Sequence, residues 1–438
     1  MKKTMQKQAT AALLTGALLA AVAACGSSPA ARAGVSGSAE LVEAAPAAHP
    51  AVATAAQLRS AALSSSALGL QVYRQLLAEG AKSDNLAVSP SSLATALGML
   101  LPGARGSSAT GLSRVLGTAG LTPAQYATAL GTLSRDEQVQ ARTDKNTLQQ
   151  ADDLWAQQGF GIRTAYLQTL AAAWNTGVHT TDFADNAAGS RQAINNLVQQ
   201  ETDGQIKNLF GPGAIDSSTR VVLTDAVYLH APWALPFEKS RTTTQPFHLA
   251  DGGTVEVPTM HRDDVLSYAS VPGWQAAQIP YQGGDLAMDL LLPDGTASGF
   301  AASAAALTPA RLQSLLGGLS RSNVDLALPR FDFETGETLD SALSALGLGD
   351  LFGPGADLSG IPSDGTPLSV HAVVQQTKVA VDENGTTAAA ATGVAISSSL
   401  GVASNGRPHV LDLDRPFLFV IRDTGTGQIL FLGQVTHP

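Results

Sequence analysis

The chain has 438 residues, of which 44% are hydrophobic and 14% are charged, so it can bury a large core and wholesale disorder is excluded. Its formal net charge is −10, which argues against a nucleic-acid binder, because such proteins present a basic face that displaces counterions from phosphates. Cys25 is the only cysteine, which excludes an internal disulfide framework and a metal site built from several thiolates.

The N-terminus has the pattern of an export signal. Three lysines precede an apolar run, Ala11 to Ala24, that is too short for a comfortable membrane span. The run ends in Val22-Ala23-Ala24-Cys25, which resembles the lipobox of bacterial lipoproteins, where cleavage precedes a cysteine that then carries lipid. We therefore expect residues 1–24 to be a lipoprotein signal peptide. The exported protein is then anchored through Cys25 at the bacterial cell surface or envelope, or released from it; an ordinary secretory peptide that leaves a free thiol is the alternative.

Residues 25–62 lack the periodicity of a helix or a strand. The stretch consists mainly of alanine, serine, glycine, proline and valine, and prolines at positions 46 and 50 interrupt it. Segments of this composition behave as flexible linkers. We expect a tether that lifts the folded domain off the membrane; a short helix packed on the domain is the alternative.

Residues 63–438 alternate between helical and strand patterns without a second linker. Leu68, Val72 and Leu76 lie on one face of a helix that ends near Gly80. Ser89-Pro90 opens the next helix, because serine caps free N–H groups and proline is tolerated in the first turn. Strand-like runs follow at Arg220–Leu229, Leu286–Leu292, Val324–Leu328, Leu368–Ala391, Phe417–Ile421 and Ile429–Val435, the last two forming a predicted hairpin. This order of elements predicts one large α+β domain.

Catalytic and cofactor motifs are missing from the sequence. The eight histidines form no pair with metal-ligand spacing, and neither a nucleophile elbow nor a phosphate-binding loop occurs. The glycines between Gly347 and Gly353 have the wrong spacing for a dinucleotide turn and suit a helix C-cap and loop. We therefore expect no cofactor and no metal, and an enzyme is the weaker hypothesis.

The stretch from Glu383 to Leu400 combines the properties of a loop and of a strand. It contains no proline, and after Glu383 no charged residue occurs before Arg407. If it is extended, every second residue from Thr386 to Ile396 shares one face, which becomes more apolar along its length, while the other face stays small. It therefore lacks the features that keep a segment out of a central strand. Its turn-formers and polyalanine also suit an exposed loop, and a plain linker is the alternative.

This stretch resembles the hinge and reactive-centre loop of the serpin family. Further motifs that resemble those of the family follow in the family's order from about Leu63 to Pro438. They are Asn85–Ser92, Thr202–Ile206, Thr224–Leu229 with Trp233–Phe237, Leu328–Phe331, Leu346–Leu348, Ala356–Ile361 and Arg415–Phe419. A single motif of this kind is weak, but the ordered set is specific.

The resemblance implies a suicide inhibitor of serine proteases with the serpin fold. In that fold a large central mixed sheet is accompanied by smaller sheets and covering helices, and an exposed loop, here about residues 383–408, is the bait. A target protease attacks the loop and forms an acyl-enzyme; the cut loop then inserts into the large sheet and drags the protease along. The hinge of this movement comprises Glu383, Gly385, Thr386, Thr387, Ala388, Ala389, Ala390, Ala391 and Thr392. The resemblance further implies a monomer whose partner is the protease.

Family spacing from Gly385 places the bait bond at Ser399–Leu400. The following segment is several residues longer than usual, so Ser398 and Leu400 are alternative scissile residues. A small, neutral residue at this position suits elastase-like or subtilisin-like proteases. Arg407 is a basic alternative that would attract trypsin-like enzymes, although it lies close to the next strand.

The resemblance also assigns the cluster beneath the point where the sheet opens, called the shutter, and the tryptophan at its upper end, called the breach. Ser89 and Ser92 match the shutter serines, and Trp233 matches the breach tryptophan. Asp225 and Gln375 stand where the family usually has asparagine and histidine. An amide can donate to a carboxylate, so the pair is expected to keep a hydrogen bond with exchanged roles; exposure of both to solvent is the alternative.

Two rival functions belong to other classes. A non-inhibitory serpin, acting as a binding or structural module, would carry charged, bulky or proline residues across Thr386–Thr392, and none is present. A hydrolase would need a catalytic constellation that the sequence does not show.

Overall fold

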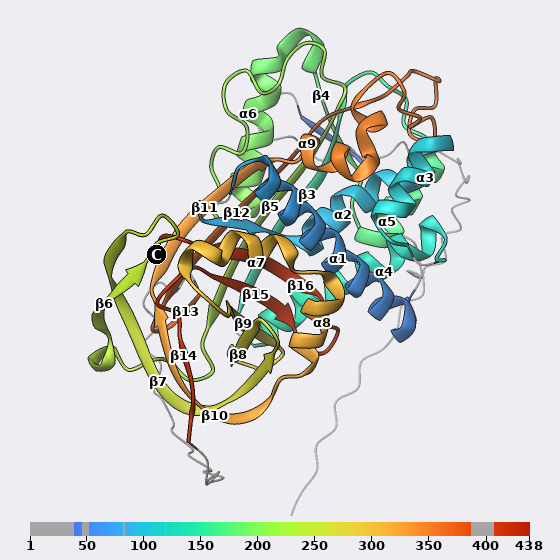
Figure 1. Cartoon of the computed structure of the whole chain (residues 1–438). Coiled ribbons are helices and arrows are strands. Elements are labelled where there is room, and N and C mark those ends of the chain that lie inside the picture. Colours follow the sequence, from blue (N-terminus) through green and yellow to red (C-terminus); the bar gives the residue numbers. More distant parts are fainter. Residues whose placement is uncertain (1–38, 46–51, 82–83, 119, 145, 387–406) are drawn as a thin grey trace, which may run out of the picture. The chain divides into compact units, whose positions relative to one another are not determined.

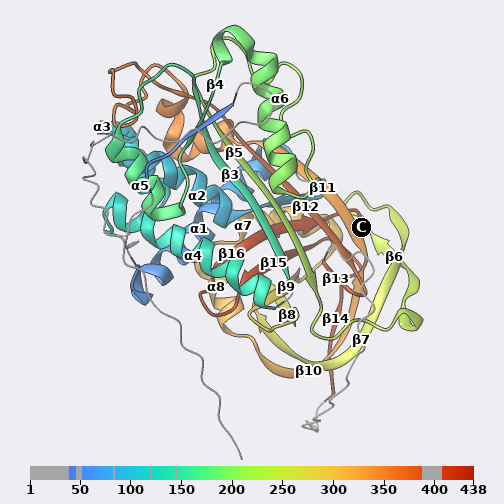
Figure 2. The same cartoon turned by 180° about the vertical axis from the view of Figure 1, so that it is seen from behind.

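The computed structural model describes residues 39–45, 52–81, 84–118, 120–144, 146–386 and 407–438 (Figures 1 and 2). The predicted signal peptide, Cys25 and most of the predicted bait loop lie outside these residues. Within the described ranges, no helix has both the length and the apolar character needed to span a membrane.

The helices begin where the sequence supplies a cap. Thr54 and Thr122 each form a capping box with the glutamine three residues later, and Ser89 accepts a hydrogen bond from the Ser92 amide ahead of Pro90. The α-helices in the described part of the chain are α1 (Ala55–Glu79), α2 (Pro90–Leu100), α3 (Gly106–Val115), α4 (Pro123–Thr143), α5 (Thr164–Trp174), α6 (Phe183–Glu201), α7 (Phe300–Ala306), α8 (Pro309–Gly317) and α9 (Asp340–Leu343).

Two sheets organise the strands. Sheet A has the order β1 (Glu40–Val42), β4 (Val178–Thr181), β3 (Thr147–Gln157), β5 (Val221–Pro232), β13 (Gly385–Thr386), β12 (Val370–Asp382) and β11 (Phe331–Thr338). Sheet B has the order β14 (His409–Asp412), β10 (Ser320–Pro329), β7 (Thr254–Val271), β8 (Trp274–Pro280), β9 (Leu286–Pro293), β15 (Phe417–Asp423), β16 (Ile429–Val435) and β2 (Leu86–Val88), with β6 (Thr243–His248) paired to β7. The predicted C-terminal hairpin is β15–β16, which confirms that expectation.

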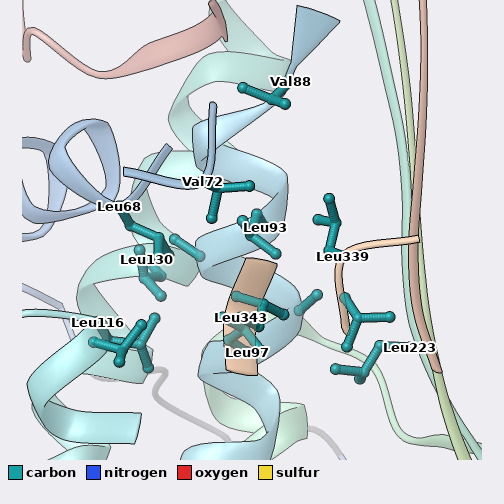
Figure 3. Close-up of a cluster of buried hydrophobic side chains, with 14 of the residues drawn as sticks. Leu68, Val72, Val88, Leu93, Leu97, Leu116, Leu130, Leu223, Leu339 and Leu343 are labelled. Atoms are coloured by element: carbon teal, nitrogen blue, oxygen red, sulfur yellow. The ribbon is translucent and has the colours of Figure 1, made fainter. Parts of the chain in front are cut away.

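Helices cover both faces of sheet A (Figures 1 and 2). On one face, α6 packs through Phe183 and Ile194 in a cluster that includes Trp155 of β3. On the other face lies the main core, in which Leu93 and Leu97 of α2 approach the sheet near Leu223 of β5 (Figure 3). Every residue of α2 is buried, including Ser91, Ser92 and Thr95. Sheet A is therefore the middle layer of a mixed α+β fold, as predicted.

The segment predicted as a tether contains two ordered elements. Residues 40–42 form β1 on the edge of sheet A, and α1 begins at Ala55, inside the range assigned to the tether. Alanine and serine, which made this stretch resemble a linker, instead let α1 pack closely, since Ala61 and Ala62 are fully buried. The alternative of a helix packed on the domain fits residues 55–62, and the tether prediction does not hold for either element.

Candidate functional site

The hinge residues Gly385 and Thr386 form β13, which lies between β12 and β5 at one end of sheet A. Thr386 is opposite Val381 of β12 and Ala231 of β5, and β13 is antiparallel to both strands. Gly385 has a φ of 154°, and a Cβ at this position would lie 2.2 Å from the Ala231 carbonyl oxygen. Only glycine fits such a close approach. Glu383, Gly385 and Thr386, which were predicted to belong to the exposed loop, are therefore buried at the end of sheet A.

Thr386 is fully buried, and its hydroxyl shares a hydrogen bond with the hydroxyl of Tyr281. The Tyr281 ring stacks on Trp233, with ring centroids 4.6 Å apart and an interplanar angle of 6°. Trp233 Nε1 donates to the Asp382 carbonyl oxygen at 2.9 Å, at the end of β12. Burial raises the pKa of Tyr281 well above its ordinary value, so the hydroxyl stays protonated. The breach tryptophan thus supports the hinge through a tyrosine that the sequence did not reveal.

Glu383 holds the same end of sheet A through an ion pair. Its carboxylate accepts hydrogen bonds from Arg330, with Nε at 3.0 Å, and from the Thr242 hydroxyl at 2.5 Å. Burial by itself would raise the pKa of Glu383, but these hydrogen bonds outweigh it and hold the pKa below its usual value. Glu383 is therefore charged at neutral pH and fastens the start of the hinge to its neighbours.

The shutter residues Ser89, Asp225 and Gln375 meet in the middle of sheet A. Gln375 accepts from the Ser89 amide at 2.8 Å, donates to the Ser89 carbonyl oxygen at 3.0 Å, and also donates to Asp225 Oδ2. Ser92 accepts from Gln150 Nε2 at 3.2 Å. Asp225 is fully buried and Gln375 is nearly so. The alternative that this pair faces solvent is wrong.

Asp152 of β3 is a shutter residue that sequence reasoning missed. It is the register partner of Asp225 across β3 and β5, which places two carboxyls side by side. Burial, followed by repulsion from Asp225, raises the pKa of Asp152, and burial raises the pKa of Asp225 as well. Oδ1 of each aspartate is buried and accepts no hydrogen bond. The pair therefore keeps a proton at pH values at which isolated aspartates have lost theirs. The one local signal was an acidic pair, Asp152-Asp153, in a buried strand.

The remaining predicted site residues lie outside the described part of the chain. They are Cys25, Thr387, Ala388, Ala389, Ala390, Ala391, Thr392, Ser399 and Leu400. Arg407 is described and exposed, two residues before β14. Among the described residues, no group of three or more His, Cys, Asp or Glu side chains could hold a metal ion.

Comparison with known proteins decides the family. A family model described as serpin (serine protease inhibitor) matches residues 63–438. The chain belongs to the serpin family. Iripin-5 of Ixodes ricinus is 34% identical over 359 residues, which cover 81% of this serpin and 89% of Iripin-5. Plasminogen activator inhibitor 1 of Neovison vison is 30% identical over 383 residues, covering 84% of this serpin and 91% of that protein. An uncharacterized serpin-like protein of Thermococcus kodakarensis is 33% identical over 371 residues, which cover 84% of this serpin and 83% of that protein.

Solved structures confirm the predicted fold. Native protease nexin-1 with heparin gives a TM-score of 0.75 at 26% identity, covering 88% of this serpin and all of that chain. Uncleaved ovalbumin gives a TM-score of 0.75 at 24% identity, covering 86% and 100% of the two chains. Since the matching family model describes serine protease inhibitors, this serpin is, at the level of the family, a serine protease inhibitor and not a protease.

The buried aspartate pair predicts that raising the pH destabilises the wild type and that Asp225→Asn lessens this effect. Because the pKa of Asp225 is raised in the native state, that state binds more protons than the unfolded chain above about pH 4, and stability falls as pH rises through this window. Asp225→Asn removes the contribution of Asp225 to this loss of stability at high pH. Its amide also supplies an N–H that can donate to the Asp152 carboxyl. We expect the variant to be more stable than the wild type by about 1–3 kcal/mol at pH 8, with a smaller difference at pH 4.

Thermal unfolding at fixed scan rate between pH 4 and pH 9 measures this effect. Asp332→Asn, which changes an exposed carboxyl on β11, is the matched control and should leave the profile of the wild type unaltered. If the Tm of Asp225→Asn and that of the wild type change with pH in parallel, the prediction that the aspartate pair keeps a proton is wrong.

Proposed function

We propose that this serpin traps serine proteases by inserting its cleaved bait loop between β5 and β12. The observation that carries the proposal is β13, because the first two residues of the required strand already pair with both neighbours. Below β13, β5 and β12 pair directly and in parallel, from Val221 with Val370 to Tyr228 with Lys378. An inserted strand would replace this parallel pairing with two antiparallel ones, which are slightly more stable per residue.

The register and the side chains of the loop support this movement. If the pairing of Thr386 with Ala231 continues, Ile396 comes opposite Val221, the first residue of β5. The uncharged stretch is thus long enough to fill the whole junction. Thr386 faces Tyr281 and the core, so the same face of an inserted strand carries Val394 and Ile396. Their burial, together with the new ladders, supplies the driving force.

The proposed targets are elastase-like or subtilisin-like enzymes, because Ser399 offers a small, neutral side chain to the primary pocket. A trypsin-like pocket holds a buried carboxylate that requires a cation. Incubation with a panel of these proteases, followed by denaturing gel electrophoresis, tests the proposal. We expect denaturant-resistant complexes with elastase-like or subtilisin-like enzymes and little complex with trypsin. If the loop is cut and no complex forms with any protease, the alternative of a non-inhibitory serpin is favoured.

The same digests locate the bait bond. We expect mass spectrometry to find a carboxy-terminal fragment that begins at Leu400, held by β15 and β16 until denaturation. A fragment that begins at Gly401 would make Leu400 the scissile residue, and one that begins at Ser399 would make it Ser398. A start at Pro408 would make Arg407 the bait and trypsin-like proteases the targets.

We further propose that the exported protein is held on a membrane by lipid on Cys25. The sequence around Cys25 supports this, because a small-small-Cys end to an apolar run is the lipobox pattern. Cys25→Ser is expected to release the protein from membranes in a fractionation assay, with serine in place of the lipidated thiol as the only change. Unchanged association of the variant would rule the anchor out.

A further inference from the structure

The five residues that follow β5, Trp233–Phe237, bind the hinge through backbone and ring N–H groups. We call this segment the strap. Its donors reach three consecutive carbonyl oxygens of the turn that joins β12 to β13. The hydrogen bonds run from Trp233 N to Asn384 at 2.8 Å, from Phe237 N to Glu383 at 2.8 Å, and from Trp233 Nε1 to Asp382 at 2.9 Å. The place of the hinge therefore depends on the place of the strap.

The strap depends on neighbouring elements for its own position. It is irregular backbone, apart from a single bridge between Trp233 and Tyr281 at its start, and Pro236 has no N–H to donate. Polar backbone groups in such a segment need partners outside it. For the carbonyl oxygen of Leu235, in the middle of the strap, the partner is Nη1 of Arg262, at 2.8 Å.

Arg262 belongs to β7 of sheet B, and only 8% of it is exposed. Besides the Leu235 carbonyl, its guanidinium contacts the carboxylate of Asp264, with Nε 3.0 Å from Oδ2. Its central carbon lies 5.7 Å from the centroid of the Phe237 ring, which is within the range of a cation–π interaction. Phe237 in turn meets Trp233 edge to face, with ring centroids 6.4 Å apart. One side chain of sheet B thus holds both the middle and the end of the strap.

The chemistry of arginine suits this position. Its planar guanidinium presents several N–H groups in a fixed fork, so it can meet a carboxylate and a carbonyl oxygen while its face lies over a ring. Asp264 compensates the charge of Arg262, as a nearly buried cation requires. The side chain of Asp264 itself is 31% exposed, so water can solvate its carboxylate when Arg262 is replaced. The contact with the strap can therefore be removed without leaving a buried charge behind.

We propose that Arg262 is a positioning residue for protease trapping, because it fixes the strap and the strap keeps the hinge at the entrance between β5 and β12. This inference rests on the loop insertion proposed above. Without Arg262, the strap loses its contacts at Leu235 and Phe237. The turn before β13 then lacks firmly placed donors, and β13 leaves sheet A more often. Insertion starts later, more of the acyl-enzyme hydrolyses first, and more inhibitor is consumed as a substrate.

Hydrogen exchange of the free protein tests the positioning without any protease. Arg262→Met removes the guanidinium and keeps an unbranched side chain, whereas Asp264→Asn removes the ion pair and leaves the guanidinium on the strap. In Arg262→Met we expect the amides of Trp233, Phe237 and Thr386 to exchange about tenfold faster, as the loss of a hydrogen bond to a charged group implies. In Asp264→Asn these amides should exchange as in the wild type, and β3 should stay protected in both variants.

Denaturing gels with a protease that the wild type traps measure the consequence for inhibition. We expect the ratio of complex to cleaved inhibitor to fall several-fold in Arg262→Met and to stay near that of the wild type in Asp264→Asn. Arg422→Met is the matched control for stability, because it breaks another ion pair of sheet B, in which Arg422 Nε lies 2.6 Å from Asp289 Oδ2. It should lower the Tm and keep the ratio, which separates positioning of the hinge from a general loss of stability.

The outcome separates this inference from the function on which it rests. Unchanged exchange of Thr386 in Arg262→Met would show that the hinge keeps its place without Arg262. An equal loss of trapping in Arg262→Met and Asp264→Asn would assign the effect to the ion pair. Either result would overturn the inference and leave the trapping mechanism in place. Failure of the wild type to form a complex with any protease of the panel would instead overturn the proposed function, while the exchange measurement would still decide whether Arg262 positions the hinge.

Discussion

Thr386→Arg is expected to convert this serpin from an inhibitor into a substrate. Thr386 is fully buried between β12 and β5, where its hydroxyl meets Tyr281. A guanidinium in this place would be an unpaired buried charge, which costs several kcal/mol. The hinge would leave the sheet and could not lead the loop back in before the acyl-enzyme hydrolyses. We expect the yield of covalent complex to fall at least tenfold while the loop is still cut at the same bond.

Two variants separate the charge from other changes at this position. Thr386→Ser keeps the hydroxyl and should trap protease nearly as well as the wild type. Tyr281→Phe removes one neutral hydrogen bond, worth about 0.5–1.5 kcal/mol, without adding a charge. The ratio of complex to cleaved inhibitor on a denaturing gel measures all three. Efficient trapping by Thr386→Arg would show that insertion does not start from this hinge.

Glu383→Lys is expected to destabilise the native state strongly. Glu383 is 1% exposed and is held by Arg330 and Thr242. Reversal of its charge breaks the ion pair and places an uncompensated cation in the buried Glu383 site beside Arg330, with a cost of about 3–5 kcal/mol. Because the entropy of unfolding grows with domain size, this loss of stability lowers the apparent Tm of the domain by only about 4–6 °C.

Thermal unfolding at neutral pH measures this change, and Glu334→Lys provides the control. Glu334 is an exposed acid on β11, so the same charge reversal should change stability by no more than about 0.5 kcal/mol. Since the pKa of Glu383 is held below its usual value, its stabilising effect is present at neutral pH and is lost as pH falls below about 4. Equal effects of the two reversals would show that the ion pair with Arg330 adds nothing.

The sequence predicted the elements that carry a local signal. The cap at Ser89-Pro90, the apolar strands and the C-terminal hairpin depend on neighbours along the chain, and the structure contains them. The predicted strand Leu368–Ala391 is the exception, because β12 ends at Asp382 and the chain turns back into β13. The family resemblance supplied the hinge. It did not show that Thr386 is already fully buried, because that burial depends on β5 and Tyr281, which lie more than a hundred residues away in the chain.

The residues that sequence reasoning missed act through contacts distant in the chain. Tyr281 reaches the hinge from a turn after β8, and Asp152 meets Asp225 only because β3 and β5 pair in one particular register. The local sequence shows neither contact, and the acidic pair Asp152-Asp153 alone does not reveal which residue faces Asp225. The tether prediction went too far for a related reason, since a stretch rich in alanine and serine has the composition of a linker and also that of a closely packed helix.

The position of β13 between the ends of β5 and β12 determines which residue pairs an inserting loop would separate first. Directly below it, β5 and β12 are joined first by Tyr228 and Lys378, and the pair Asp225–Gln375 is the fourth from that end. An entering chain can therefore part the strands one residue pair at a time instead of breaking the whole ladder at once. In the register of β13, Thr392 would arrive at the Asp225–Gln375 hydrogen bond. If the loop inserts as proposed, a half-inserted state is expected at this point, with β5 and β12 separated above the pair Asp225–Gln375 and still paired below it.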